Sequence, residues 1–122
     1  MQIHEFDPQI YPVKLWIVKK PTQKLIDDNF IEKNGENLNF TTRSHAVMSC
    51  YNQVVVNKNN NLYGILISIW TNPSVNNIAH ESTHAARFIW DWIEEGNTGI
   101  EADAYLVGWI AECIEKVKRN KF

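Results

Sequence analysis

Long hydrophobic runs, cysteine and net charge are all scarce in this sequence of 122 residues. The longest apolar stretch, residues 63–70, is too short to cross a bilayer, so we expect no membrane segment. The first eight residues have neither the basic nor the apolar region of a signal peptide, which predicts a cytoplasmic protein. The two cysteines, Cys50 and Cys113, have no CxxC spacing, and we expect reduced thiols rather than a disulfide framework.

An excess of positive charge is also absent. Twelve Lys and Arg stand against 14 Asp and Glu, giving a formal net charge of −2. The basic residues near the C-terminus are those expected at the negative end of a final helix, namely Lys116, Lys118, Arg119 and Lys121. The sequence therefore predicts no nucleic-acid partner, because such binders carry a concentrated positive surface.

What the chain does have is the composition of a globular domain. Hydrophobic residues make up 44% and charged residues 21%, and five Trp, five Phe and four Tyr supply large side chains for a core. We expect a single domain over residues 1–122, with most tryptophans in the core rather than in a substrate pocket.

The order of elements predicts an α+β fold. Residues 10–20 alternate as a strand does, and Pro21 and Thr22 then open a short helix that Asn34 and Gly35 end. Residues 46–57 and 62–71 form a hairpin around a polar turn at 57–61. The return strand is nearly all apolar, which favours burial of both its faces, although an exposed edge would let a peptide add to the sheet.

Two helices complete the chain. Apolar residues at helical spacing predict one helix from Asn76 or Asn77 to residue 95, stopped by the glycine turn at 96–99. A second helix covers residues 100–120, with Leu106, Ile110 and Val117 facing inward. The result is a β-α-β-β-α-α order with a small mixed sheet.

The first of these helices contains the sequence His80-Glu81-Ser82-Thr83-His84, an HExxH motif. Two histidines four residues apart lie one helical turn apart, so both rings can reach one cation. Glu81 lies about 100° around the helix, where it can contact a metal-bound water. The alternative is an ordinary pair of surface histidines, but the pair borders the inward stripe and a zinc site is the better interpretation.

A catalytic zinc normally has three protein ligands and a water. The candidates for the third ligand are Glu101, Asp103, Asp91, His45 and His4. Glu101 is favoured because the glycine turn returns the last helix beside the histidines. Glu101, Tyr105, Gly108 and Glu112 share one face of that helix, and Gly108 predicts a close approach of two helices on the metal side.

HESTHA, the glycine turn and the following Glu101-Ala102-Asp103-Ala104-Tyr105-Leu106-Val107-Gly108 resemble the gluzincin type of zinc metallopeptidase. The resemblance is to the small single-domain members carried by bacteriophages and bacterial mobile elements, and it covers the C-terminal third of the chain. It implies one catalytic zinc held by His80, His84 and Glu101, with Glu81 acting on the bound water. It also implies a minimal zincin-like fold in which a strand edge holds an extended peptide.

One position departs from the larger gluzincins. They often have an Asp four residues after the third ligand, where this chain has Tyr105, as in the small phage-type pattern. Tyr105 lies near the metal by spacing and is a candidate donor to the oxyanion, or else a packing residue. His45 and Arg87 are less constrained candidates for the same role.

The expected activity is hydrolysis of peptide bonds in a peptide or protein substrate. Glu81 would accept a proton from the zinc-activated water and pass it to the leaving amine. Two alternatives remain open. The first is a non-catalytic binding module that is stabilised by zinc. The second is a zinc hydrolase of a non-peptide amide, because HExxH chemistry does not specify the acyl group.

Overall fold

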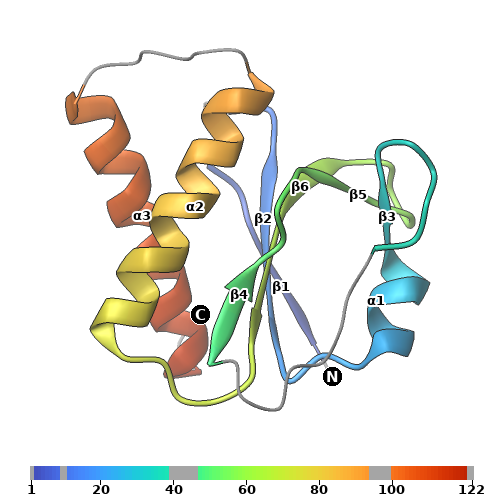
Figure 1. Cartoon of the computed structure of the whole chain (residues 1–122), viewed down its shortest axis with the longest axis horizontal. Helices are drawn as coiled ribbons and strands as arrows, with labels where there is room; N and C mark the ends of the chain where they lie inside the picture. The colour runs from blue at the N-terminus through green and yellow to red at the C-terminus, as the bar shows by residue number, and fades with distance from the viewer. Residues whose placement is uncertain (1, 9–10, 39–46, 94–99, 121–122) are drawn as a thin grey trace.

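A computed structural model of the chain describes residues 2–8, 11–38, 47–93 and 100–120. Within them, six strands form one mixed sheet with the order β1-β2-β6-β5-β3, and β4 also pairs with β6 (Figure 1). Only β2 and β6 run parallel, and all other pairs are antiparallel. The strands are β1 (Ile3–Phe6), β2 (Lys14–Lys19), β3 (Phe30–Glu32), β4 (Met48–Cys50), β5 (Val55–Asn57) and β6 (Tyr63–Ile69).

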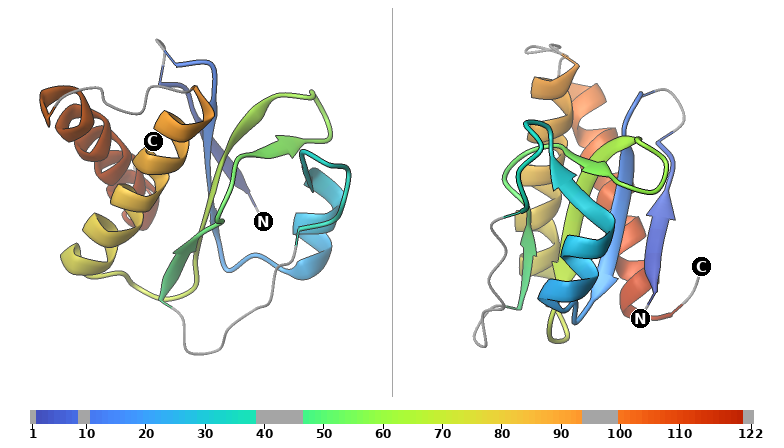
Figure 2. Two further views of the ribbon diagram at one scale, coloured as in Figure 1. Left: turned by 45° about the horizontal axis from the view of Figure 1, so that its top comes forward. Right: turned by 90° about the vertical axis from the view of Figure 1, so that its right-hand side faces the viewer.

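Helices cover both faces of this sheet. The long helices α2 (Val75–Trp92) and α3 (Ile100–Lys118) pack together on one face, and the short helix α1 (Gln23–Asn29) lies on the other (Figures 1 and 2). None of the described helices is both long enough and apolar enough to span a membrane. The predicted α+β class is confirmed.

The alternation of side chains along the central strands builds two cores. Leu15 and Ile17 of β2 point to the core beneath α2 and α3, whereas Trp16 and Val18 point to the core beneath α1. Strand β6 is buried along six of its seven residues. It is therefore a central strand with both faces covered, and it is not the open edge at which a peptide could add.

The N-terminal half differs from the sequence-based expectation in two places. The helix that opens at Thr22 ends at Asn29, and Phe30 begins β3, which pairs with β5. Tertiary pairing overrides the helical pattern here, because Phe30 fills the core beneath α1. Strand β1, which the sequence analysis did not predict, is short and only half-buried, so its pattern is weak.

The predicted hairpin is confirmed, but its first strand is broken. Strands β4 and β5 both pair antiparallel with β6, one at each end of it. The pairing of β4 with β6 places β4 beside α2, and among the described strands β4 pairs only with β6. This makes β4 the strand nearest to the HExxH motif.

Helix α2 begins two or three residues earlier than predicted, since its N-cap is Ser74 and not Asn76 or Asn77. Ser74 is its N-cap and accepts a hydrogen bond from the Asn77 backbone, while the Asn77 side chain accepts one from Ser74, which completes a capping box. The expected end of this helix and the glycine turn at 96–99 lie outside the described residues. Helix α3 has the predicted start and nearly the predicted end.

Candidate metal centre

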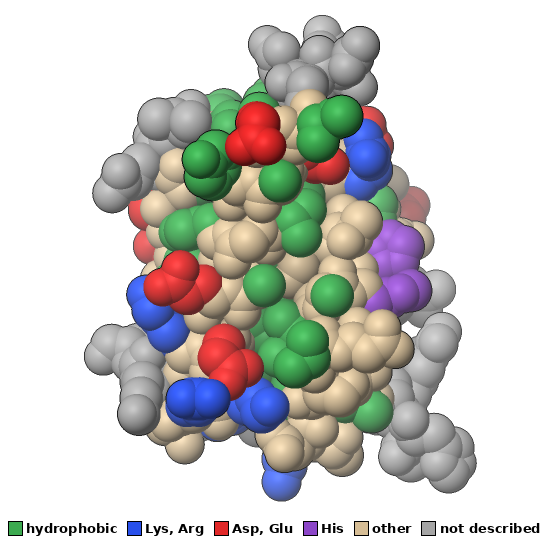
Figure 3. Space-filling view, turned by 90° about the vertical axis from the view of Figure 1, so that its left-hand side faces the viewer, with side chains coloured by type: hydrophobic (Ala, Val, Ile, Leu, Met, Phe, Trp, Pro, Cys, Tyr) green, Lys and Arg blue, Asp and Glu red, His purple; other side chains and the backbone are tan. Residues whose placement is uncertain are grey.

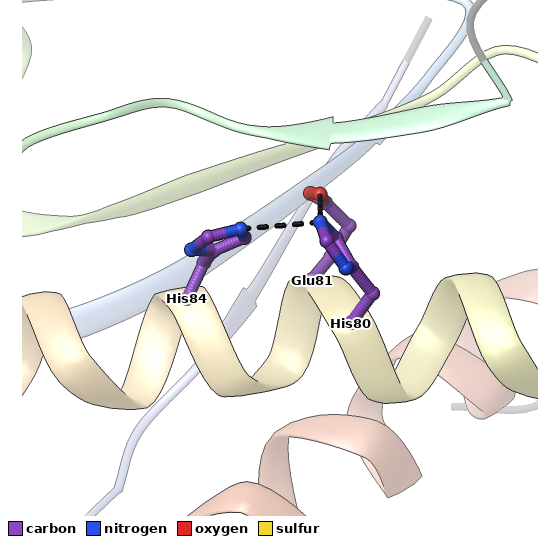
Figure 4. A group of neighbouring side chains, drawn as sticks. All are labelled: His80, Glu81 and His84. Atoms are coloured by element: carbon purple, nitrogen blue, oxygen red, sulfur yellow. Dashed lines mark hydrogen bonds and ion pairs between the residues drawn. The ribbon is translucent and has the colours of Figure 1, made fainter.

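The HExxH motif occupies the middle of α2, on the side of the helix that faces β4 (Figure 4). His80 and His84 are exposed and their ring centres lie 4.7 Å apart, and a space-filling view shows histidine side chains grouped at the surface (Figure 3). Glu81 points instead toward β4, and its side chain is only 13% exposed. The motif therefore combines two accessible imidazoles with one sheltered carboxylate.

The three side chains converge on one another. The Nε2 atoms of His80 and His84 are 3.2 Å apart, and Oε1 of Glu81 lies 3.7 Å from Nε2 of His80. One potential ligand atom from each of the three residues lies within 4.8 Å of the other two. This group could hold a metal ion.

The separation of the histidine nitrogens provides a quantitative test of that fit. Two nitrogen ligands of a tetrahedral zinc, each about 2.0–2.1 Å from the ion, are about 3.3–3.4 Å apart. The observed 3.2 Å is about 0.1–0.2 Å shorter than this spacing. The same separation accommodates an Nε2–H···Nε2 hydrogen bond, so the two rings would need little movement to hold a metal ion.

The carboxylate of Glu81 is held by the backbone of β4. The Cys50 N–H donates a hydrogen bond of 3.0 Å to Oε2 of Glu81, which leaves Oε1 directed toward the histidines. Burial, and secondarily the negative charge of Glu81, raise the pKa of the Cys50 thiol. The thiol of Cys50 is therefore neutral at physiological pH and is a poor metal ligand in that form.

This backbone donor is a contact of the candidate site that sequence reasoning missed. The side chain at position 50 does not indicate this hydrogen bond, because any residue other than proline there supplies the same N–H. The contact could be predicted only from the pairing of β4 with β6, which decides which N–H groups of β4 point away from the sheet. Tyr51 donates its N–H inward to Leu66 of β6, so the preceding N–H of Cys50 points outward to α2.

Glu101, the expected third ligand, does not join this group. It lies exposed in the first turn of α3, and α3 packs on the opposite side of α2 from the histidines (Figure 4). Leu106 and Ile110 face the core, and Glu101 lies on the opposite side of the helix from Ile110. The packing of α3 therefore directs Glu101 to solvent.

The other residues on that face of α3 are also directed outward. Tyr105 is 76% exposed and forms no hydrogen bond with another described residue, so it is not brought to the histidines. A Cβ atom added at Gly108 would meet nothing within 4 Å. The expectation that Gly108 marks a close helix–helix approach is wrong, because Gly108 is exposed and faces away from α2.

The remaining candidate ligands lie elsewhere. Asp103 accepts a hydrogen bond of 2.8 Å from Nε1 of Trp90 and lies 4.0 Å from Nη2 of Arg87, so it joins α2 to α3. Asp91 is exposed near the end of α2, and His4 lies in β1 at the far edge of the sheet. The fifth candidate, His45, lies outside the described residues.

A row of aromatic side chains continues from the histidines along α2. The ring of His84 stacks on Phe88 at 6.2 Å, one turn later, and Trp92 contacts Tyr63 at 4.9 Å. The Nζ atom of Lys33 lies 4.9 Å from the Trp92 ring centre. Phe88 and Trp92 are only half-buried, whereas Trp90 is buried as the sequence analysis expected of the tryptophans.

No protein-family model matches this chain, and no curated protein or solved structure gives a significant match to it. The resemblance to gluzincins therefore remains one of motif residues. The structure supports its coarser part, a small α+β domain with His80, Glu81 and His84 grouped on a helix.

Proposed function

We propose that His80 and His84 bind a zinc ion and that the chain is a zinc-dependent hydrolase of peptide bonds. The observation that carries this proposal is the 3.2 Å separation of the two Nε2 atoms, which suits two ligands of one tetrahedral zinc. The exposed histidines leave the remaining coordination positions accessible to water and substrate.

A zinc ion bound there would lower the pKa of a bound water and polarise a substrate carbonyl. Glu81 is suited to proton transfer because its Oε2 is held by the Cys50 N–H and its Oε1 is directed toward the histidines. In the proposed reaction Oε1 accepts the proton from the attacking water and returns it to the leaving amine, whose bond to the carbonyl carbon breaks.

The position of β4 favours a peptide as the substrate. It lies beside the motif, and among the described strands only one of its edges is paired. An extended peptide could hydrogen-bond to the other edge. The outward N–H of Cys50 is already used by Glu81, so the peptide would rely on other backbone groups of β4.

In the full proposal Glu101 is the third ligand and Tyr105 a donor to the oxyanion. Both lie on the outward face of α3, so both roles require the first turns of α3 to move around α2. Within the described residues the third member of the group is Glu81 itself. If Glu81 binds the metal directly, no general base remains, and the alternative of a non-catalytic zinc-stabilised module follows.

Measuring the metal content distinguishes a catalytic site, in which Glu101 is the third ligand, from a non-catalytic module in which Glu81 binds the metal. Zinc is measured in the purified protein and in the Glu81→Gln, Glu101→Ala and Glu112→Ala variants, the last being a matched carboxylate on the outer face of α3. We expect Glu81→Gln to keep zinc and lose hydrolysis, Glu101→Ala to lose most zinc, and Glu112→Ala to change neither. Loss of zinc in Glu81→Gln would support the non-catalytic module, and full zinc in Glu101→Ala would remove Glu101 as a ligand and make Asp103 the next residue to test.

Digestion of a broad peptide library, compared with hydrolysis of small amide substrates, tests the substrate class. We expect cleavage of extended peptides that depends on added zinc and is lost in Glu81→Gln. Hydrolysis of small amides without peptide cleavage would favour the non-peptide amide alternative.

A further inference from the structure

A cavity of about 480 Å³ lies at the carboxyl ends of the two parallel strands β2 and β6, and it shares no residue with the candidate metal centre. Its lining includes Lys19, Lys20, Trp70, Asn72, Pro73 and Lys118. Its size lies within the range typical of small-molecule sites. In sheets flanked by helices, the carboxyl ends of parallel strands are a common place for ligands.

The charge of this cavity is positive and is not neutralised by carboxylates. Lys19, Lys20 and Lys118 line it, and no acidic side chain in the described part of the chain lies within ion-pairing distance of any of them. The ammonium group of Lys19 donates to two neutral acceptors, the Lys118 carbonyl at 3.4 Å and Asn120 Oδ1 at 2.7 Å. The end of α3 carries about half a negative charge from the helix dipole, which is less than the three positive charges of Lys19, Lys20 and Lys118. The cavity therefore keeps a net positive charge.

The backbone of Lys20 is held in place at the end of β2. Lys20 has a left-handed φ of 48°, although it precedes Pro21, and its N–H donates to the Ile69 carbonyl at 2.6 Å. A non-glycine residue pays about 1–2 kcal/mol for that conformation, and the residue before a proline normally adopts an extended one. The structure thus fixes Lys20 beside Lys19 at the rim of the cavity despite the strain.

The remaining lining suits an apolar ligand body and an anionic group. Trp70 is half-buried and offers apolar surface to the cavity, and the buried Pro73 is also part of the lining. Asn72 and Pro73 directly precede the Ser74 N-cap, so the positive end of the α2 dipole lies at the same place. The lysines and the helix end favour a doubly charged anion such as phosphate, which is bound best by several donors.

We propose that this cavity binds a small organic phosphate, a phosphate monoester carried by a flat apolar group. The phosphate lies among Lys19, Lys20 and Lys118, and the apolar group lies against Trp70. This proposal does not depend on the proposed zinc chemistry, because the two sites have no residue in common.

Two-dimensional amide NMR with phenyl phosphate as the probe tests the proposal, and inorganic phosphate and phenol are titrated separately. At concentrations up to about 10 mM we expect phenyl phosphate to shift saturably the signals of Lys19, Lys20, Asn72 and the Trp70 indole N–H. We expect inorganic phosphate to bind more weakly at the same signals and phenol to give no saturable shift. Equal affinity for inorganic and phenyl phosphate, or no saturable shift with phenyl phosphate, would overturn the proposal.

Charge-removing variants test the named residues. We expect Lys20→Gln and Lys118→Gln each to weaken phenyl phosphate binding roughly tenfold or more, as loss of a charged hydrogen bond predicts. Lys116→Gln is the matched control, since it removes the same charge from the same end of α3 but lies outside the cavity lining. If Lys116→Gln weakens binding as much as Lys118→Gln does, the effect is general electrostatics and the assigned site is wrong.

Discussion

Neighbouring residues of the HExxH motif occupy three different environments around one helix. His80 and His84 face solvent, Glu81 is sheltered beside β4, and Ser82 is buried in the core. The 100° step between successive helical residues produces this division. The motif therefore presents two imidazoles to solvent, while Ser82 between them packs inward.

Ser82 offers a prediction on stability that is independent of the metal. Its Oγ is buried and has no hydrogen-bond partner among the described residues. We expect Ser82→Ala to raise the free energy of unfolding by about 1 kcal/mol, because it removes an unsatisfied hydroxyl. Urea unfolding measures the change. Thr83→Ala is the control, as Thr83 is exposed and donates to the Ala79 carbonyl, and its effect should stay within about 0.5 kcal/mol. A clear loss of stability in Ser82→Ala would contradict this account.

His4 predicts a pH dependence of stability. Burial, and to a smaller extent the positive charge of Lys19, lower the pKa of His4 in the folded protein. The unfolded chain then takes up this proton first, so stability falls as the pH drops from about 7 through 6.5 and below. We expect the urea midpoint of His4→Gln to fall less than that of the wild type between about pH 7 and pH 5. An equal fall in both proteins would show that His4 contributes nothing to it.

At the scale of single elements, the pairing of β2 with β6 depends on one glycine. A Cβ atom at Gly64 would lie 2.5 Å from Cζ3 of Trp16 and 2.6 Å from the Lys14 carbonyl oxygen. The carbonyl belongs to the paired strand and the Trp16 ring is fully buried, so neither can give way easily.

We therefore expect Gly64→Ala to lower the free energy of unfolding by about 1–3 kcal/mol. Gly108→Ala is the matched control and should have the opposite sign. It lies in the interior of α3 with open space around it, where alanine favours the helix by up to about 1 kcal/mol. Thermal unfolding of the two variants measures both effects, and similar shifts of the same sign would refute the contrast.

The apolar periodicity predicted α2, α3 and the central strand, because long elements average over many side chains. The periodicity gave the wrong secondary structure for Phe30, because this residue pairs with the distant Asn57 in the sheet and does not continue the preceding helix. In the site, the spacing of His80 and His84 was sufficient because one helix fixes both. The placement of Glu101 was not, since it depends on how two helices pack.

The sequence nevertheless indicated that Glu101 would face away from the core. The inward stripe of α3, with Leu106 and Ile110, was identified correctly. Glu101 and Tyr105 lie on the opposite side of the same helix, so a stripe that faces α2 and the sheet directs them outward. The motif resemblance and the helical phase thus made conflicting predictions, and the structure follows the phase.

At the scale of the whole molecule, metal binding at α2 should be linked to folding. Helix α2 packs against α3, β4 and β6, so its unfolding disrupts the core on that face of the sheet. The unfolded chain does not hold the two Nε2 atoms of His80 and His84 at 3.2 Å, so a zinc ion bound as proposed would favour the folded state. Metal binding at this local site would therefore change the stability of the whole domain.

The size of this linkage follows from mass action. At a free zinc concentration about 100 times the Kd, the folded state gains about 2.7 kcal/mol, which for a domain of this length corresponds to a rise in Tm of roughly 10 °C. Calorimetry with and without zinc measures the rise, and His80→Ala should abolish it while leaving the metal-free Tm nearly unchanged, because His80 is exposed. Glu101→Ala reduces the rise only if α3 moves to supply the third ligand. An unchanged Tm in the wild-type protein at saturating zinc, or an equal rise in His80→Ala, would mean that the histidine pair is not where zinc binds the folded chain.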